Sequence, residues 1–159
     1  MRKIPDEVDR AIVALLQTDG RMSCSKIARS LGYVTARTVS NRIRRLTKTG
    51  IIRVSAVPNP RVLGYAIAAD IAITVAPGNG KVRQVAEAIR ELPEVSYVAI
   101  TAGDRDVNIQ VNAIDVPHLQ RFITETLQGI EGVQRTTTGL LTEVLEDIYE
   151  WKIPEELPP

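Results

Sequence analysis

The 159-residue chain is long enough for one ordinary domain or two small ones, and its 44% hydrophobic and 25% charged residues are typical of a soluble globular protein. No apolar run approaches the roughly 20 residues of a membrane span, and the first residues lack the apolar core of a secretory signal, so we expect a cytoplasmic protein with no membrane partner. The net charge of +1 conceals +9 in residues 1–64 and −8 in residues 65–159, an asymmetry expected when one end of a chain binds a polyanion.

Three short helices are predicted in the basic half. Asp6 makes an N-cap for the first helix, with a weak capping box to Asp9 three residues later. Ser23 caps the second helix, Gly32 ends it, and Thr35 opens the third. Three short helices with a tight turn between the second and third form the core of helix-turn-helix DNA-binding proteins.

The outward face of the third helix is basic. Its apolar side chains fall on one stripe at helical spacing, so its basic side chains are expected to point away from the core. The first turns of such a helix reach base edges and its later turns reach phosphates, which predicts base contacts from Arg37, Thr38 and Asn41. The predicted DNA-binding set is Thr35, Arg37, Thr38, Ser40, Asn41, Arg42, Arg44, Arg45 and Lys48.

The basic residues of the third helix have two alternative interpretations besides DNA binding. A merely solvated basic face is disfavoured because the helical spacing, the caps and the local charge of +9 agree with one another. Arg42 lies beside the apolar stripe, and for this residue a DNA contact and a structural role, with its stem packed on the core, are equally open.

A short strand is predicted from the alternation of residues 51–56, and the Pro/Asn/Pro run that follows marks a domain boundary. We therefore expect four segments along the chain. They are a DNA-binding domain (1–57), a linker (58–64), a second domain (65–146) and a C-terminal extension (147–159).

The second domain has the element order βαββαβ. Its predicted strands cover residues 65–76, 95–102, 107–113 and 133–144, with one helix before Pro93 and another over residues 115–127. This order predicts an α+β, ferredoxin-like domain with an antiparallel sheet and both helices on one face. We interpret residues 107–113 as apolar on both alternations, which predicts that the open sheet face packs against a second copy in a homodimer.

A Gly-Asp-x-Asp loop at residues 103–106 joins the second and third predicted strands. Its carboxylates could hold the ammonium group of an amino acid and its N–H groups the carboxylate, whereas the alternative is a plain hairpin turn. Threonines of the last strand could line the same cleft, although threonine is also a common strand residue. The predicted effector-binding set is Thr101, Gly103, Asp104, Asp106, Thr136, Thr137 and Thr138.

Neither an enzyme nor a cofactor is predicted. Cys24 and His118 have no evident acid or base partner, and His118 is expected to face solvent. A single cysteine and a single histidine offer neither an internal disulfide nor a soft-ligand metal cluster, so we predict no metal.

Several motifs follow one another in a characteristic order. In the first half they are Asp9-Arg10-Ala11-Ile12-Val13, Asp19-Gly20-Arg21, Ile27-Ala28, Val39, Arg42-Ile43, Leu46 and Gly50-Ile51-Ile52. In the second half they are Leu92-Pro93-Glu94-Val95, Gly103-Asp104-Arg105-Asp106, Leu119 and Gly132-Val133-Gln134-Arg135-Thr136-Thr137-Thr138. By their order and spacing, residues 6–146 resemble the Lrp/AsnC family of leucine-responsive and asparagine-synthetase regulators, also called feast/famine proteins.

The resemblance implies a winged helix-turn-helix joined by a strand to a sensing domain, in dimers that build tetramers, octamers or open arrays. It also implies an amino acid ligand bound between dimers near residues 103–106, and double-stranded DNA contacted by two helices at once. The chain departs from the family by one extra residue between Gly32 and Val39 and by a tail that contains Trp151. The predicted function is sequence-specific transcription regulation in response to a small molecule; the alternative is an architectural DNA-binding protein with a vestigial sensing site.

Overall fold

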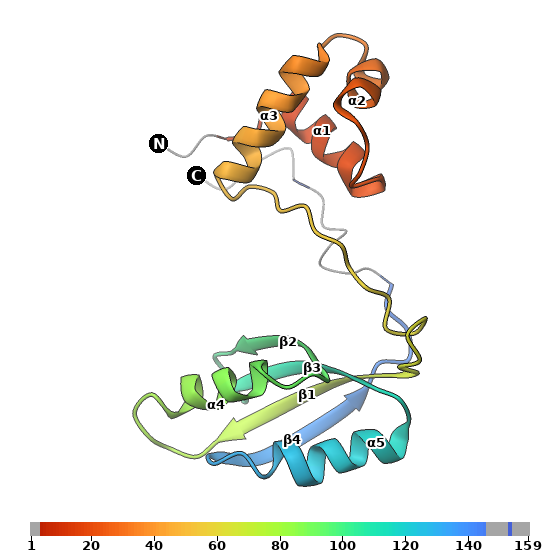
Figure 1. Cartoon of the computed structure of the whole chain (residues 1–159). Helices are drawn as coiled ribbons and strands as arrows, with labels where there is room; N and C mark the ends of the chain where they lie inside the picture. Colours follow the sequence, from red (N-terminus) through yellow and green to blue (C-terminus); the bar gives the residue numbers. More distant parts are fainter. Residues whose placement is uncertain (1–3, 146–152, 154–159) are drawn as a thin grey trace. The chain divides into compact units, whose positions relative to one another are not determined.

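The computed structural model of the chain describes residues 4–145 and residue 153 (Figure 1). The backbone forms two compact units, of which the first contains the residues up to Val57 and the second runs from Pro58 to Val144. Each unit has a hydrophobic core of its own. The predicted C-terminal extension, residue 153 excepted, lies outside the described residues.

The first unit contains three helices: α1 (Glu7–Thr18), α2 (Cys24–Leu31) and α3 (Ala36–Lys48). The three predicted N-caps, Asp6, Ser23 and Thr35, each accept a backbone N–H from the first turn of the helix they precede. Gly32 ends α2 with a φ of 78°, a left-handed conformation that glycine adopts without a steric cost. The helix-turn-helix prediction is therefore confirmed, and its central buried side chains are Ile12, Ile27 and Val39.

The strand predicted over residues 51–56 is wrong. The N–H groups of Ile51 and Ile52 donate to the carbonyl of Leu46, so these residues close the C-terminal end of α3. The residues after them have no regular secondary structure. A strand needs a neighbour for its backbone N–H and C=O groups, and no segment in the described part of the chain pairs with this one.

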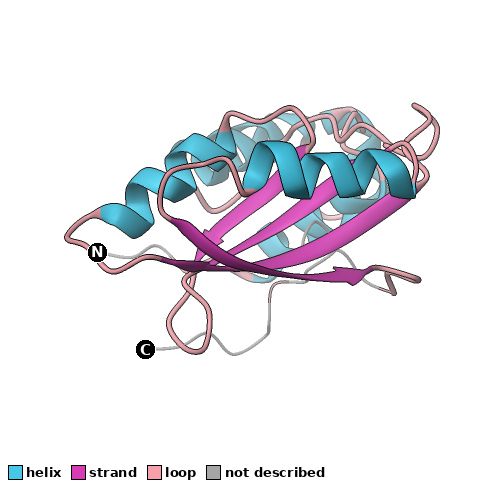
Figure 2. Cartoon of the chain, turned by 90° about the horizontal axis from the view of Figure 1, so that it is seen from below, coloured by secondary structure: helices cyan, strands magenta, loops and turns pink. Residues whose placement is uncertain are grey.

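The second unit is a four-stranded antiparallel sheet covered by helices. Its elements are β1 (Ile67–Val75), α4 (Lys81–Arg90), β2 (Val95–Ile100), β3 (Val107–Ala113), α5 (Val116–Arg121), the π-helical continuation η1 (Phe122–Leu127) and β4 (Val133–Leu140). The strand order is β2-β3-β1-β4, and the helices lie over one face of the sheet (Figures 1 and 2). The predicted α+β, ferredoxin-like fold is confirmed.

The two faces of this sheet differ in polarity, because successive strand residues point to opposite sides. On β1, Ile71 and Ile73 are buried beneath the helices, whereas Asp70 belongs to the open face. On β3, all four apolar residues are buried on the helix side, and the intervening positions are Asn108, Gln110 and Asn112. The interpretation of β3 as apolar on both alternations is wrong, and it does not support a dimer through this face.

Candidate nucleic-acid interface and ligand site

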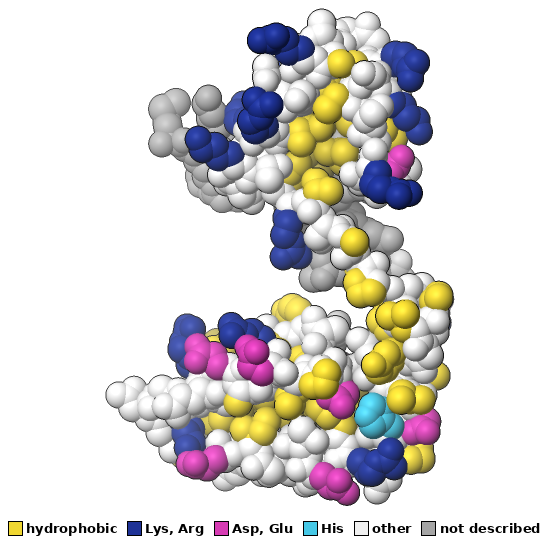
Figure 3. Space-filling model, viewed as in Figure 1, with side chains coloured by type: hydrophobic (Ala, Val, Ile, Leu, Met, Phe, Trp, Pro, Cys, Tyr) yellow, Lys and Arg dark blue, Asp and Glu magenta, His cyan; other side chains and the backbone are white. Residues whose placement is uncertain are grey.

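One side of α3 is exposed and basic. Arg37, Asn41, Arg44 and Lys48 are all exposed, and they recur at intervals of four, three and four residues. This is the spacing of a single helical face, and the opposite side of the helix buries Val39 and Leu46. In the view of Figure 3, most of the charged side chains on the N-terminal unit are Lys or Arg.

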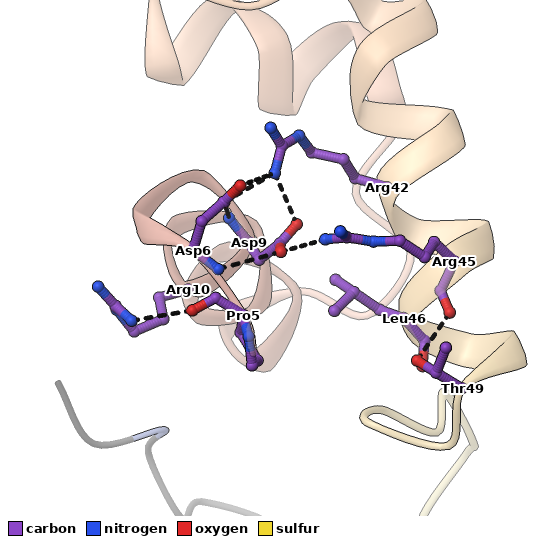
Figure 4. Close-up of polar contacts among 8 residues, drawn as sticks. All are labelled: Pro5, Asp6, Asp9, Arg10, Arg42, Arg45, Leu46 and Thr49. Atoms are coloured by element: carbon purple, nitrogen blue, oxygen red, sulfur yellow. Dashed lines mark hydrogen bonds and ion pairs between the residues drawn. The ribbon is translucent and has the colours of Figure 1, made fainter. Parts of the chain in front are cut away.

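Two arginines of α3 turn away from this face. The Arg42 Nη1 lies 2.6 Å from the Asp6 Oδ2 and 2.9 Å from the Asp9 Oδ1, and Arg45 Nη2 binds the other oxygen of Asp9 (Figure 4). The side chain of Asp9 is 0% exposed, whereas that of Asp6 is 52% exposed. The expectation that Arg45 points away from the core is therefore wrong. For Arg42, the contacts favour the structural interpretation.

The ion pairs also shift the pKa values of Asp6 and Arg42. The hydrogen bond from Arg42 is the main cause that lowers the pKa of Asp6 below its ordinary value, and burial acts in the opposite direction. The hydrogen bonds to Asp6 and Asp9 raise the pKa of Arg42 in turn. At neutral pH these groups therefore form an ion-paired cluster that links the start of α1 to α3.

The remaining predicted DNA-binding residues lie near the start of α3. The hydroxyl of Thr35 accepts the N–H of Thr38 and also hydrogen-bonds the hydroxyl of Thr38 at 2.9 Å. Ser40 is half-buried. Thr38, Asn41, Arg42 and Arg45 together line a shallow groove along the helix.

The loop at residues 103–106 holds two carboxylates in different surroundings. The Asp106 Oδ2 accepts the N–H of Val75 at 2.8 Å, and the Asp106 N–H donates to the carbonyl of Ile73. Thr101 closes the loop by donating its hydroxyl to the carbonyl of Arg105. Asp104, in contrast, has a side chain that is 85% exposed and contacts Arg105. Thr101 and Asp106 thus hold the loop in place, while Asp104 is accessible.

A shallow pocket lies between this loop and the strands β1 and β4. It is lined by Asp70, Ala72, Thr74, Asp104, Arg105, Arg135, Thr137, Thr138 and Gly139. Two carboxylates and two guanidinium groups therefore surround one cavity. Of the predicted effector residues, Asp104, Thr137 and Thr138 line it.

The three consecutive threonines of β4 do not share this pocket. Thr136 pairs with buried Ile73 on the helix side of the sheet, and its hydroxyl lies 3.5 Å from the Gln128 Nε2. Thr137 pairs with Ala72 on the open face. The strand period of two residues therefore places Thr136 and Thr137 on opposite faces of the sheet.

Sequence reasoning missed three charged residues of the pocket: Asp70, Arg105 and Arg135. The carboxylate of Asp70 accepts the side-chain N–H of Asn108 at 2.8 Å, which orients it on the open face. The available signal was the position of Asp70 between apolar residues of β1, because a charged residue in such a strand must face away from the core.

His118 is half-buried, contrary to the expectation of a solvent-facing residue, and it has partners. Its Nδ1 accepts the N–H of Ile114 at 3.2 Å, and its Nε2 lies 3.6 Å from Glu94. These contacts tie the start of α5 to the loop before β2. In the part of the chain that the structure describes, no cluster of His, Cys, Asp or Glu is suited to a metal ion, and no helix is long and apolar enough to span a membrane.

Comparison with known proteins decides the family. The family model of the AsnC-type helix-turn-helix domain matches residues 6–47, and that of the Lrp/AsnC ligand binding domain matches residues 69–149. The chain is 46% identical over 140 residues to an uncharacterized HTH-type transcriptional regulator of Pyrococcus abyssi. The matched region covers 87% of each protein. The chain belongs to the Lrp/AsnC family.

Solved structures share the fold over most of the chain. The structure of E. coli AsnC superposes with a TM-score of 0.82 at 23% identity, over 92% of this chain and 99% of that one. A transcriptional regulator of Neisseria meningitidis in complex with L-Met superposes with a TM-score of 0.78 at 24% identity, over 96% of both chains. As a member of the Lrp/AsnC family, the protein is a DNA-binding transcriptional regulator with a ligand binding domain, and it is not an enzyme.

Proposed function

We propose that the protein recognises a specific DNA sequence through the exposed face of α3. The observation that carries the proposal is the single stripe formed by Arg37, Asn41, Arg44 and Lys48, opposite a buried apolar side. A helix with this distribution fits the major groove, where Arg recognises guanine and Asn recognises adenine by paired hydrogen bonds.

We infer separate roles for these four residues from their order along α3. Arg37 and Asn41 lie in the first half of α3, which enters the groove in helix-turn-helix proteins and contacts base edges. Arg44 and Lys48 lie in the second half, where cationic side chains contact phosphates and position the helix without reading sequence. The Thr35 cap fixes the first turn and so the direction in which Arg37 leaves the helix.

We further propose that the pocket beside residues 103–105 binds an amino acid. Asp70 and Asp104 can accept hydrogen bonds from an ammonium group, and Arg105 and Arg135 can donate to a carboxylate. An amino acid carries a positive and a negative charge at once. A pocket lined by groups of both charges therefore binds an amino acid better than it binds a purely anionic or purely cationic ligand. The Neisseria meningitidis regulator of the same fold was solved with L-Met, which supports this ligand class.

The proposed assembly is a homodimer that builds tetramers or octamers, with duplex DNA as the partner. Two copies of α3 related by a two-fold axis would contact half-sites about 34 Å apart, one helical turn of DNA. This geometry predicts a pseudopalindromic operator.

The decisive experiment compares affinity for a site selected from a random duplex pool with affinity for bulk DNA over a salt series. A sequence-specific regulator retains a large ratio of the two affinities at every salt concentration. A ratio near one throughout would support the architectural alternative. A thermal-shift screen of the twenty amino acids, with sizing chromatography on each hit, tests the ligand and the assembly together.

A further inference from the structure

Asp9 is an unusual residue for the interior of a three-helix domain. It is the one charged residue among the described residues whose side chain is fully buried. A carboxylate removed from water is destabilising unless its oxygens are paired with charged or strongly polar donors. Both oxygens of Asp9 are paired: the Oδ1 with Arg42, and the Oδ2 with Arg45 and with the backbone N–H of Asp6 at 3.2 Å.

The two arginines contact Asp9 from adjacent turns of the same helix. Arg42 and Arg45 are three residues apart on α3 and project toward the start of α1 (Figure 4). Apolar packing between helices is not directional, so by itself it permits some rotation and sliding. Charge-assisted hydrogen bonds to the two oxygens of one carboxylate impose a direction on both side chains. Asp9 therefore restricts how far α3 can rotate about its own axis.

This rotation matters because Arg37, Asn41, Arg44 and Lys48 form a single stripe along α3. A shift of one residue turns a helix by about 100° and would carry Arg37 and Asn41 out of the direction in which they now point. The cluster also pairs each positive charge with a negative one, since Arg42 and Arg45 meet Asp6 and Asp9. The Nε of Arg45 is buried and has no hydrogen-bond partner in the described part of the chain, which shows how far this side chain is turned inward.

We propose that Asp9 is the positioning residue of the DNA-contacting helix, and that Arg42 and Arg45 belong to this ion cluster and not to the set that contacts phosphates. The inference rests on the proposed role of α3. It separates two pairs of cations on one helix: Arg42 and Arg45, neutralised by carboxylates of α1 and its cap, and Arg44 and Lys48, exposed and without an acidic partner in the described structure.

The test measures the salt dependence of binding to bulk duplex DNA, which requires no known operator. Each lost phosphate contact reduces the slope of log K against log salt concentration by about 0.9. Arg44→Gln should show this reduction, while Arg42→Gln and Arg45→Gln should keep the wild-type slope. A reduction in Arg42→Gln or Arg45→Gln equal to that of Arg44→Gln would overturn the inference. An unchanged slope in Arg44→Gln would overturn the proposed DNA-contacting face itself, and the inference with it.

Removal of the carboxylate provides the complementary measurement. In Asp9→Asn, Arg45 loses its anionic partner while Arg42 keeps Asp6. One positive charge then becomes available to a phosphate, so the slope on bulk DNA should steepen by up to about 0.9. Asp6→Asn, at a half-exposed position, covers the case in which Asp9→Asn does not fold. It leaves Arg42 and Arg45 with the single carboxylate of Asp9, so the slope should steepen by up to about 0.9. Thermal melting reports the fold of each variant. Folded variants that keep the wild-type slope would contradict the proposal.

Discussion

The carboxylate of Asp106 accepts the backbone N–H of Val75 at 2.8 Å, and so joins the loop after β2 to the last residue of β1. The backbone of Asp106 adds two further bonds, from its N–H to Ile73 and from Thr101 to its carbonyl. The neighbouring acid Asp104 makes no such contact with the sheet and extends into solvent beside Arg105. Two aspartates of one short motif therefore have separable roles.

Substitution of Asp106 should destabilise the second unit. Asp106→Ala leaves the Val75 N–H without its acceptor, and the free energy of unfolding should fall by about 1–3 kcal/mol. Asp106→Asn, which keeps an acceptor oxygen, should lose less, and Asp104→Ala should stay within about 0.5 kcal/mol of the wild type. Urea unfolding measures all three. Equal losses in Asp104→Ala and Asp106→Ala would contradict the assignment of the loop anchor to Asp106.

Substitution of Asp104 should instead affect the ligand. An amino acid that stabilises the wild type contributes about 2.7 kcal/mol when its concentration is 100 times its Kd, and this gain should be largely lost in Asp104→Ala. Glu87→Ala, a change of an exposed acid on α4 away from the pocket, is the matched control and should keep the gain. Thermal shift with and without the amino acid gives the comparison, and a full shift in Asp104→Ala would remove this residue from the site.

The two halves of α3 should differ in their effect on sequence recognition. Arg37→Ala and Asn41→Ala should each weaken binding to the selected site by about 1–3 kcal/mol more than binding to random DNA, because they remove base contacts. Lys48→Ala should weaken both by the same factor, because phosphates are common to all sequences. Titrations of both DNAs at one salt concentration measure the two affinities. If Arg37→Ala weakened binding to the selected site and to random DNA equally, a base contact from Arg37 would be excluded.

The stability of the first unit should depend on pH through Asp6. Its pKa is below 3.8 in the folded chain because of Arg42, so its stabilising contribution is complete above pH 3.8 and is lost as the pH falls through the folded-state pKa. Because Asp6 is half exposed, the effect should be under about 1 kcal/mol. Asp6→Asn keeps an N-cap acceptor but does not titrate, so its stability should fall less than that of the wild type in urea unfolding between pH 5 and pH 3. If the free energy of unfolding fell equally in the wild type and in Asp6→Asn, the contribution from the titration of Asp6 would be ruled out.

Features that depend on nearby residues were predictable from the sequence. The caps Asp6, Ser23 and Thr35 act within one turn of their own helices, and the order βαββαβ follows from periodicity and from breaks such as Pro93. Among the candidate residues, Arg37, Asn41, Arg44 and Lys48 were correctly predicted to be exposed, because the apolar stripe of one helix determines its opposite face.

The sequence by itself thus determined the helices, their caps, the element order and the exposed basic stripe, since each arises from contacts or periodicity within one segment. Only the tertiary structure decided what arises between segments. Arg42 and Arg45 turn inward because Asp6 and Asp9, more than thirty residues earlier, offer them carboxylates. The pocket likewise combines Asp70, Asp104 and Arg135 from two strands and a loop. Such pairings depend on tertiary contacts between segments that are distant in the sequence, so the spacing of residues within one segment does not predict them.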